Sequence, residues 1–451
     1  MSRRSMLAIL GMTGAVSAAV VWDSVVRLTT DPTYQLLGSS GQRSMAVDPA
    51  GNVWVFWLDQ RTVPYQLWYR RYDAPTRVWL PEERLTSQSQ QCYPAAVVAD
   101  LLGNIHLVWH MEAWPCRGIW YKPFDAARRL WLPETLFQPL PNDRVGRHPV
   151  ITALAGSTRI AVAWYGHSDT STVWQIVLRE LIPDSGWTEL FSVTSALCDH
   201  FYPALGYDAE GNLFVVWQGR DNGGVYNQIF CRRRVSGQWQ PVEHVSDMPN
   251  APDQYNPAIS VSPDGGYCQV LWHGRRQSEI YLRPLFRQRT PSGWLAIEEP
   301  GGITSFQQEQ VDIADLGMGR AAAVWRNQLT DALASSELLY CERDSTGYWS
   351  APEPVIAINT GIVLEPTIAV MGRDIHVVWY DGSSGNYDIY YRHGTFASAV
   401  TNEAGRACPL PTARHRLYDA TGRRIGSVPQ RAGVYFLQQS GTATRKLLVL
   451  P

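Results

Sequence analysis

Lysine is almost absent from this sequence: Lys122 and Lys446 are the only two, so nearly all of the 39 basic residues are arginine. These bases are balanced by 41 Asp+Glu, which leaves a formal net charge of −2. No overall field therefore draws the chain to nucleic acid or to an anionic membrane, and neither is expected as a partner. Arginine recognises carboxylates well, but a codon bias explains the shortage of lysine more simply.

Long apolar runs are also absent beyond the N-terminus, so no transmembrane span is expected. At the N-terminus, Arg3 and Arg4 precede an apolar run that ends in small residues near Ala18 and Ala19. This order is typical of a secretory signal peptide, which we assign to residues 1–19, and a twin-arginine export signal would look similar. Export would permit disulfides among the seven cysteines, although an odd count leaves at least one unpaired within the chain.

Several catalytic patterns are missing as well. The sequence contains no HExxH, no GxSxG and no phosphate-binding loop. His106 and His110 are four residues apart, but they lie on and just beyond a predicted strand, where that spacing does not place both on one face. We therefore expect no metal ion and no cofactor.

What the chain does contain is a repeat of two strands joined by a tight turn, seen most clearly from Tyr202 to Trp217. Aligning the tryptophan that ends the second strand gives seven copies, spaced by 52 to 55 residues. This period suits a four-stranded propeller blade. The aligned tryptophans are Trp57, Trp109, Trp164, Trp217, Trp272, Trp325 and Trp379. The sequence therefore predicts an all-β, seven-bladed propeller over residues 20–396.

A second tryptophan, which starts the outer strand, occurs in only six of the copies. The seventh is found at the other end of the chain, where residues 22–30 match residues 79–87 at the Trp, Arg, Leu and Thr positions. We therefore expect the N-terminal segment to supply the outer strand of the last blade. Such pairing closes the ring and leaves no open sheet edge.

The repeated tryptophans and turns are expected to be structural. A tryptophan at one fixed place in every repeat fills the wedge between blades, although tryptophan also stacks on sugars at glycan-binding faces. Turns of the form Asp-x-x-Gly-Asn start at Asp48, Asp100 and Asp208. Calcium loops need more oxygen ligands, so these are expected to be hairpin turns with a left-handed glycine.

The repeat stops near Ala397. Residues 397–411 have the composition of a linker, and residues 412–451 are expected to form a small C-terminal β module. Its three segments begin Leu417-Tyr-Asp-Ala-Thr-Gly-Arg, Gly433-Val-Tyr-Phe and Arg445-Lys-Leu-Leu-Val. Together they resemble the sorting domain of the bacterial type IX secretion system.

The resemblance implies that the type IX secretion machinery is a partner. It also implies that the protein is secreted from, or displayed on, the outer surface of a Gram-negative bacterium, with the tail either removed or exchanged for an anchor. A carbohydrate-binding or stalk module is the alternative interpretation of the same residues.

Function is expected at the end of the propeller where first strands begin and second strands end, because these loops meet around the central channel. Polar residues at equivalent places there differ from blade to blade, unlike packing residues. The ligand-binding candidates are Tyr93, His110, His148, Tyr202, Arg220, Asn256, His273 and Asp381. Cys92 and Cys116 should reach this same end of the second blade, where the placement would allow a disulfide but the sequence does not decide whether one forms.

The repeats resemble the sialidase and Asp-box propeller superfamily, and Asp344-Ser-Thr-Gly347-Tyr-Trp349 is the nearest match to its Asp-box turn. Two departures count against sialidase activity: sialidases have six blades, and their early Phe-Arg-Ile-Pro motif is absent. The activity would need an arginine clamp, a tyrosine activated by a carboxylate, and an acid. The resemblance would assign these roles to Arg43, Arg275 and Arg326, to Tyr202 or Tyr255 with Glu365, and to Asp59.

The sequence thus predicts an exported, monomeric propeller that binds a glycan or a protein on its channel end. An exo-acting glycoside hydrolase of sialidase type is the alternative, and it requires one pocket that gathers three arginines with a Tyr–Glu pair. A purely structural surface protein is the third possibility, and it predicts no concave site at all.

Overall fold

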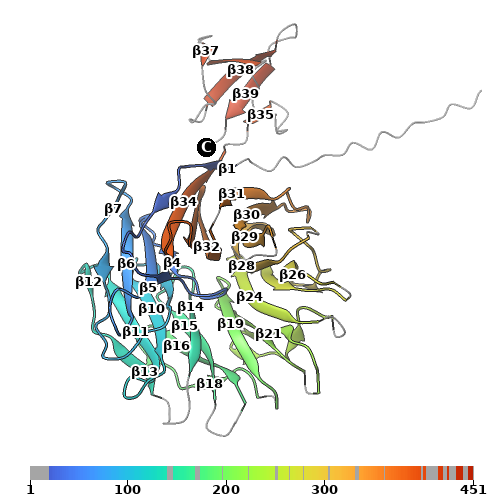
Figure 1. The fold of residues 1–451 in the computed structure, drawn as a ribbon. Coiled ribbons are helices and arrows are strands. Elements are labelled where there is room, and N and C mark those ends of the chain that lie inside the picture. Colours follow the sequence, from blue (N-terminus) through green and yellow to red (C-terminus); the bar gives the residue numbers. More distant parts are fainter. Residues whose placement is uncertain are drawn as a thin grey trace, which may run out of the picture. The chain divides into compact units, whose positions relative to one another are not determined.

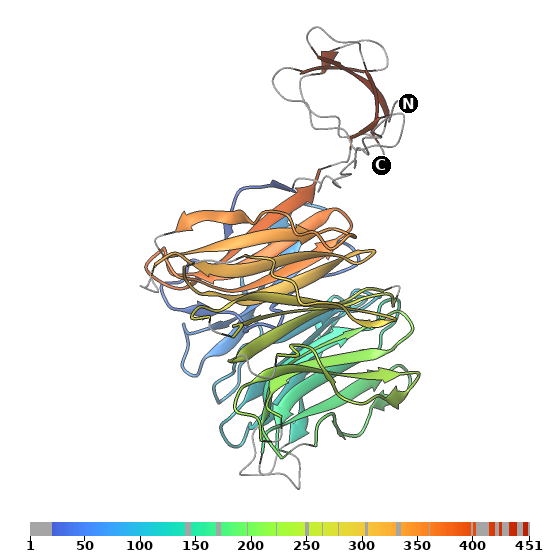
Figure 2. The ribbon, with the colours of Figure 1, turned by 90° about the vertical axis from the view of Figure 1, so that its right-hand side faces the viewer.

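The computed structural model describes residues 20–139, 146–167, 173–195, 197–221, 223–248, 252–263, 265–277, 279–302, 305–330, 335–359 and 361–397, and five short C-terminal strands. Every regular element in this part of the chain is a β-strand. Seven antiparallel sheets form the blades of a propeller, which Figure 1 shows around a common centre and Figure 2 shows from the side. The predicted fold class is confirmed.

Each blade begins with an innermost strand, which is followed by a second strand. The innermost strands are β3 (Gln35–Leu36) with β4 (Met45–Val47), β9 (Ala96–Ala99), β14 (Arg147–Ala153), β19 (His200–Tyr207), β24 (Gln254–Val261), β28 (Gln308–Gly317) and β32 (Val363–Met371). The second strands are β5 (Val53–Asp59), β10 (Ile105–Met111), β15 (Ile160–Gly166), β20 (Leu213–Gly219), β25 (Cys268–Gly274), β29 (Arg320–Gln328) and β33 (Asp374–Asp381).

The third strand of each blade lies between the second strand and the outer strand. They are β6 (Gln66–Asp73), β11 (Gly118–Asp125), β16 (Gln175–Ile182), β21 (Gln228–Val235), β26 (Arg283–Thr290), β30 (Ser336–Arg343) and β34 (Asp388–Phe396). The outer strands are short and mostly split: β7 (Val78–Trp79) with β8 (Glu83–Arg84), β12 (Leu130–Trp131) with β13 (Thr135–Pro139), β17 (Gly186–Trp187) with β18 (Phe191–Ser192), β22 (Gln238–Trp239) with β23 (Glu243–His244), β27 (Gly293–Trp294), β31 (Glu353–Asn359), and β1 (Val20–Trp22) with β2 (Val26–Arg27).

The seven aligned tryptophans are the largest fully buried side chains of the described residues, each less than 2 % exposed. They pack between blades: Trp109 shares a cluster with Phe56 of the first blade, and Trp164 shares one with Val108 of the second. An aromatic ring of this kind removes about 150–250 Å² from water, or about 4–6 kcal/mol at 25 cal/mol/Å² as an upper bound. The predicted packing role is confirmed.

The Asp-x-x-Gly-Asn turns are also confirmed as hairpin turns. Asp48 accepts hydrogen bonds from the backbone N–H of Ala50 and Asn52, and its other oxygen accepts from the Asn52 amide and the Trp54 indole. Gly51 has φ 83°, a value that favours glycine. The carboxylate is therefore engaged inside its own turn. Asp100 and Asp208 make the same backbone contacts.

The ring is closed by the N-terminal segment, as the sequence predicts. Strand β2 pairs with β34 of the seventh blade, with Val26 opposite Tyr391. The Thr29 hydroxyl donates to Asp388 at 3.0 Å, and Arg27 pairs with the same carboxylate at 2.6 Å. Because Asp388 is fully buried, this junction belongs to the core and not to a loose end.

The C-terminal module is a separate unit with its own sheet, and the predicted signal peptide, residues 1–19, lies outside the described residues. Its strands are β35 (Val400–Asn402), β36 (His415–Asp419), β37 (Arg424–Ile425), β38 (Gly433–Gln439) and β39 (Arg445–Val449). They pair in the order β35-β39-β38-β36-β37. In the described part of the chain, no helix has the length and apolar character needed to cross a bilayer.

The sequence left open whether Cys92 and Cys116 are bonded, and in the structure both residues are free thiols. Cys92 is fully buried, and its thiol lies 3.5 Å from the Thr86 hydroxyl. Cys116 lies 3.7 Å from the Ser89 hydroxyl. Each sulfur is thus directed to a hydroxyl of the loop between the first and second blades, although both do lie at the same end of the blade.

Candidate functional site

The centre of the propeller is filled by residues 37–44, which we call the plug. They interrupt the innermost strand of the first blade, since Leu36 pairs with Leu58 and pairing resumes at Met45 with Val55. A Cβ atom on Gly41 would lie 3.2 Å from the carbonyl oxygens of both Pro203 and Pro257, on two neighbouring inner strands. The plug therefore runs along the inner wall of the ring.

Polar contacts join the plug to most of the inner strands. Gln42 donates to the carbonyl oxygen of Pro149 at 3.0 Å in the third blade. Arg43 donates to the carbonyl oxygens of Ile259 at 2.8 Å and Ile313 at 2.7 Å, and lies 3.5 Å from Asp312. The guanidinium of Arg43 is thus held by the inner strands of the fifth and sixth blades.

The inner strands share a second feature at this level, a bulge that shifts the register against the neighbouring strand. At each bulge a residue other than glycine has a positive φ, which is uncommon and marks local strain. We call these the bulge residues: His148 (φ 53°), Tyr202 (φ 48°), Asn256 (φ 46°), Gln310 (φ 56°) and Glu365 (φ 47°). Five blades therefore hold a different side chain in one unusual backbone conformation around the plug.

On one side of the plug, the second and third blades contribute a linked set of polar groups. Tyr93 stacks on His110 with ring centroids 4.4 Å apart. Glu112 lies 2.6 Å from Arg147 Nε and 3.7 Å from His110 Nε2. Burial lowers the pKa of His110, against the opposing effect of Glu112, and the imidazole is neutral at pH 7. The arrangement leaves His110 Nδ1 without a hydrogen-bond partner in the described protein.

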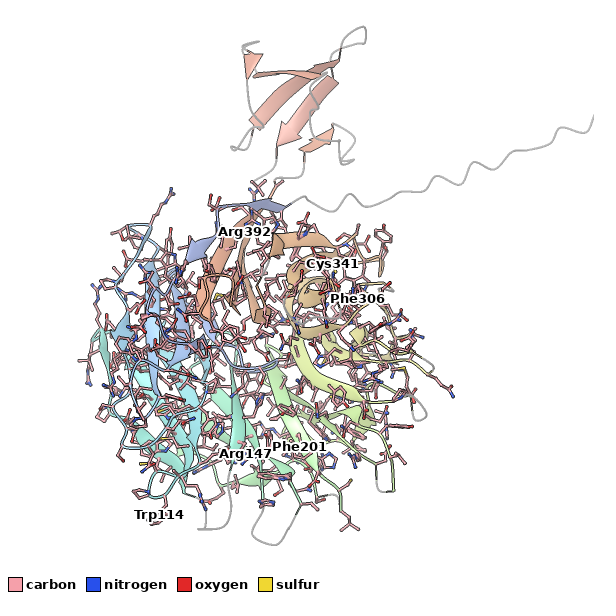
Figure 3. All side chains as sticks on the ribbon, in the orientation of Figure 1. Trp114, Arg147, Phe201, Phe306, Cys341 and Arg392 are labelled. Atoms are coloured by element: carbon pink, nitrogen blue, oxygen red, sulfur yellow. The ribbon has the colours of Figure 1, made fainter. Side chains whose placement is uncertain are left out.

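The third and fourth blades continue this set with aromatic rings. His148 meets Tyr202 edge to face at 4.8 Å, and Tyr165 lies 5.6 Å from Tyr202. Burial lowers the pKa of His148 to about 3, so this imidazole is also neutral. The guanidinium of Arg147, labelled in Figure 3, lies 5.5 Å from the centre of the Trp174 ring. We call Tyr93, His110, Glu112, Arg147, His148, Tyr165 and Tyr202 the basin.

The other side of the plug has different chemistry. Gln310 and Glu365 exchange two hydrogen bonds of 3.2 Å, from the Gln310 amide to the Glu365 carboxyl and from the Glu365 backbone to the Gln310 side chain. Arg326, only 2 % exposed, pairs with Glu309 at 2.6 Å. Burial, with Glu309 adding to it, raises the pKa of Glu365 to about 8. A neutral carboxylic acid at pH 7 therefore faces this side.

Both sides are connected through one residue of the plug. The backbone of Ser40 lies close to His148 in the basin and to Glu365 opposite. The Ser39 hydroxyl also lies 3.4 Å from His148 Nδ1. The plug thus lies beside a bulge residue on each side of the channel.

The fourth and fifth blades bring further candidates together. Tyr255 lies 6.0 Å from His273 between ring centroids. Burial and a hydrogen bond to Asp253 raise the pKa of Tyr255 to about 12, while the nearby guanidiniums of Arg275 and Arg220 oppose the rise. The backbone N–H of Asn256 donates to Gln218 at 2.7 Å. This second group borders the basin through Tyr202, the bulge residue between them.

The carboxylates predicted at the strand ends are engaged in structural contacts. Asp59 is fully buried and accepts hydrogen bonds from the Trp57 indole at 2.8 Å and from Arg61. Asp381 is 2 % exposed and accepts from the backbone N–H of Ser383 at 2.6 Å. Among the described residues, no group of three His, Cys, Asp or Glu side chains is placed to hold a metal ion.

The candidates for a sialidase clamp have separate surroundings. Arg43 is bound in the wall, and Arg326 is buried against Glu309. Arg275 lies near Tyr255 in the fifth blade. Glu365, the proposed activator of a tyrosine nucleophile, is hydrogen-bonded to Gln310.

Tyr165, Gln310 and Arg147 take part in these groups but were not among the sequence-based candidates. Tyr165 directly follows Trp164, as His110 follows Trp109 and His273 follows Trp272, so the repeat alignment carried the signal for it. Gln310 was missed because it is followed by Val311, whereas each of the other bulge residues is followed by a proline. Arg147 lies one residue before His148, and only its contact with Glu112 reveals its role.

No family model matches the chain, and no curated protein does. Among solved structures it is similar to the polysaccharide lyase Uly1, with a TM-score of 0.55 and 10 % identity over 80 % of this chain and 90 % of the lyase. An ulvan lyase of family PL25, bound to -[GlcA(1-4)Rha3S]-, gives 0.55 and 11 % over 79 % and 94 %. The NanB sialidase of Streptococcus pneumoniae gives 0.43 and 10 % over 82 % and 70 %. At these identities the lyases share the fold with this chain.

Proposed function

We propose that this protein is a glycan-binding propeller whose ligand is an acidic polysaccharide held in the basin. The proposal rests on the composition of the basin. There Arg147 lies near the neutral imidazoles of His110 and His148 and near the phenols of Tyr93 and Tyr202. Phenols and imidazoles donate to and accept from sugar hydroxyls, and aromatic rings stack on pyranose faces. Arg147 is 40 % exposed in its side chain and can reach a carboxylate or sulfate group.

The similarity to lyases supports the choice of an acidic polysaccharide over a protein. The ulvan lyase was solved with a chain that contains glucuronate and sulfated rhamnose. A fold shared at 11 % identity does not transfer that substrate, so the ligand rests on the chemistry of the basin. A protein ligand, the other candidate from the sequence, would be recognised by the same groups only if it presented acidic side chains.

Elimination chemistry is a second candidate, favoured by the contact between His148 and Tyr202. In a uronate, a base takes the proton beside the carboxylate, its electrons form the ring double bond, and the glycosidic oxygen leaves with a proton from an acid. Two adjacent groups that can exchange protons suit this pair of transfers. The low pKa of His148, about 3, makes its imidazole a weak base, which is why binding is the primary proposal.

Binding to acidic polysaccharides, measured with the full chain on a glycan array and by titration calorimetry, tests the proposal. Arg147→Met should weaken binding about tenfold, or about 1.4 kcal/mol, since a charge-assisted contact is lost. Arg128→Ser is the matched control, because Arg128 is 71 % exposed and pairs only with Asp125 on the edge of the second blade. If Arg147→Met and the unmodified protein bind with equal affinity, the basin is not the binding site.

Catalysis is tested on the same samples. An unsaturated product, detected by its ultraviolet absorbance, would establish elimination, and Tyr202→Phe should then lower the rate far more than the affinity. Cleavage of a fluorogenic sialoside would instead support the sialidase-type alternative. Binding without either product would identify a binding module.

Export is part of the proposal. The leader at residues 1–19 and the C-terminal residues that resemble a type IX sorting domain both support delivery to the cell surface or medium. Deleting residues 412–451 should leave the protein in the periplasm of a host that has the type IX machinery. Fractionation with an antibody against the propeller measures this, and unchanged surface delivery would contradict it.

A further inference from the structure

The nineteen tryptophans of this chain differ in exposure. Trp114 is 67 % exposed, whereas the other eighteen, all within the described residues, are buried or half-buried. A single exposed apolar side chain needs no explanation by itself. The position of Trp114, the anchoring of its loop and the charge beside it show what this ring can contact.

Trp114 lies on the loop between β10 and β11, residues 112–117, which we call the rim loop. The loop begins at Glu112, the carboxylate that lies between Arg147 and His110 in the basin. Trp114 is two residues further on, so its Cα lies within about 7 Å of the Cα of Glu112, because a chain advances at most about 3.6 Å per residue. Figure 3 labels Trp114 at the edge of the propeller. The exposed indole therefore borders the basin.

Both ends of the rim loop are tied down. Arg117 Nε donates to the carbonyl oxygen of Glu112 at 2.8 Å, which closes the loop on itself. The Trp120 indole donates to the carbonyl oxygen of Cys116 at 2.7 Å, and Cys116 is buried. A rigid aromatic ring on an anchored loop loses little conformational freedom when a ligand binds, and this favours affinity.

The rim loop also carries a cation, Arg117, that makes no ion pair with any residue that the structure describes. Glu112, at the start of the same loop, pairs with Arg147 at 2.6 Å instead. The two terminal nitrogens of Arg117 therefore remain to bind a carboxylate or sulfate group.

The corresponding loop of the first blade shows that this combination of ring and cation is not a feature of the fold. Val63 precedes a proline there, as Trp114 does in the second blade. The arginine of that loop, Arg61, pairs with Asp59 at 2.8 Å and with Glu82 at 2.7 Å. The first blade thus offers neither an aromatic face nor an unpaired guanidinium.

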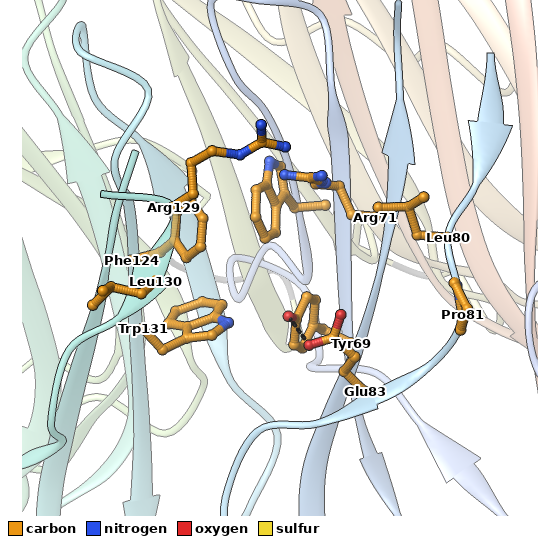
Figure 4. Close-up of a pocket in the computed structure, with 10 residues that line it drawn as sticks. Tyr69, Arg71, Leu80, Pro81, Glu83, Phe124, Arg129, Leu130 and Trp131 are labelled. Atoms are coloured by element: carbon orange, nitrogen blue, oxygen red, sulfur yellow. Dashed lines mark hydrogen bonds between the residues drawn. The ribbon is translucent and has the colours of Figure 1, made fainter. Parts of the chain in front are cut away.

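The aromatic cavity between the first and second blades, shown in Figure 4, is different in kind. Its Trp54 ring is only 2 % exposed, and the Tyr69 hydroxyl is hydrogen-bonded to Glu83 at 2.5 Å. A cavity also occurs between the fourth and fifth blades, so such spaces belong to the packing of the blades. The rim loop, by contrast, presents its ring to solvent.

We propose that the rim loop is a second sugar subsite, where Trp114 stacks on one pyranose ring and Arg117 binds the acidic group of that sugar. The inference rests on the proposed function, because the sugar at the rim loop is the neighbour, in the same polysaccharide, of the sugar held in the basin. A ligand that fills both places is a segment of an acidic chain. A single terminal sugar, as an exo-acting sialidase would remove, fills the basin alone.

Titration calorimetry of the full chain tests the subsite with ulvan, alginate and hyaluronan, which are uronate-containing polymers, and with methyl β-glucuronide, a single sugar. Trp114→Ala should weaken polymer binding about tenfold, because the stacking face is lost, and leave the affinity for the single sugar unchanged. Trp114→Phe keeps an aromatic face and should restore most of the affinity. Tyr348→Ala is the matched control, since Tyr348 is 68 % exposed on the turn after β30, at the opposite ends of the strands.

The cation is tested in the same way. Arg117→Gln should also weaken polymer binding about tenfold, since a charge-assisted contact is lost. Arg128→Gln removes an exposed arginine outside the rim loop and should leave the affinity unchanged.

Acrylamide quenching gives a second readout, because Trp114 is the one exposed tryptophan of the chain. Bound polymer should reduce the quenching in the unmodified protein and have no such effect in Trp114→Phe. A loop with a purely structural role would show no protection by the polymer.

The outcomes separate this subsite from the basin. No binding of any of the polymers overturns both. Polymer binding that Arg147→Met weakens and Trp114→Ala does not overturns the rim-loop subsite alone. Loss in Trp114→Ala without loss in Arg147→Met would place the sugar at the rim loop only, and would overturn the pairing of the two sites. An equal loss for the polymer and the single sugar would place the indole in the basin itself, and would overturn the separate subsite.

Discussion

On one side of the plug, the bulge residues His148 and Tyr202 lie among aromatic and imidazole rings, while on the other side Gln310 and Glu365 bond to each other. The backbone conformation is the same at all four positions. On the first side, the side chain of Arg147 is 40 % exposed. On the second side, Arg326 is buried and pairs with Glu309. The cation of the first half is thus accessible from solvent, whereas the second half buries its cation and leaves Arg326 Nε, Arg326 Nη2 and Glu365 Oε2 without hydrogen-bond partners among the described residues.

This difference shows that the backbone conformation of the bulge is kept from blade to blade, while the side chain that it carries is free to vary. A propeller must repeat the residues that pack its blades, but it need not repeat those that surround its axis. Strain at the bulges is retained on both sides, although only one side has a half-exposed cation, Arg147. Three predictions test whether the two halves are as distinct as their contacts indicate.

The largest expected effect is on the pH dependence of stability. The pKa of Glu365 is raised from 4.5 to about 8, so the folded state holds a proton that the unfolded state has lost. Its contribution is fully present below pH 4.5 and is lost as pH rises to about 8, on the order of 5 kcal/mol in all. Glu365→Gln should remove this loss, measured by urea unfolding from pH 5 to 8.5.

His148 should show the opposite sign. Its pKa falls from 6.5 to about 3, so the unfolded state binds the proton first and stability decreases as pH falls below 6.5. His148→Asn should reduce the loss on the acid side and leave the alkaline side unchanged. Parallel stability curves for both variants and the unmodified protein would show that the two halves do not differ in this way.

The second prediction compares the two arginines. Arg326→Met breaks a buried pair and leaves the Glu309 carboxylate uncompensated, which should cost about 3 kcal/mol in unfolding free energy. Arg147→Met removes a half-exposed pair and should cost less than about 1 kcal/mol. Chemical denaturation at one pH measures both, and similar costs would remove the distinction between the halves.

The smallest effect is expected at Gly41, which lies between them. Its φ of 85° and the two carbonyl oxygens at 3.2 Å leave little room for a methyl group. Gly41→Ala should destabilise the protein by about 1–2 kcal/mol and alter binding in the basin by displacing Ser40. Gly156→Ala is a control with a similar φ of 75° and no atoms within 4 Å of the added carbon. Equal behaviour of the two variants would show that the plug is not tightly held.

Most of the blade architecture could be predicted because it repeats. Trp57 and its six equivalents, the turn at Asp48 and the closing segment at residues 22–30 all follow from the period and the alignment. The plug could not be predicted, since residues 37–44 have no counterpart in other blades against which to compare them. The composition of such an insertion does not indicate whether it folds into the centre of the ring or out toward solvent.

The sequence predicted where the site lies in the fold but not which side chains form it. Proline after Tyr93, His148, Tyr202, Asn256 and Glu365 marked the inner ends of the strands, but it gave no information on which side chains meet. The roles of Arg147 and Glu112 depend on a contact between different blades. Cys92 and Cys116 were placed at the correct end, yet their sulfurs are directed to hydroxyl groups and not to each other.

The junction between β2 and β34 also determines when the molecule can be completed. Arg27 and Asp388 are separated by 361 positions in sequence, among the longest separations for any pair in the ring. Contacts this remote form late, because a long loop must close first and synthesis must reach the last blade. Until then the edge of β34 is an unpaired strand in a nearly finished structure. Chaperones that shield such edges would act in that interval, and a chain that stalled there would be the species most prone to aggregate.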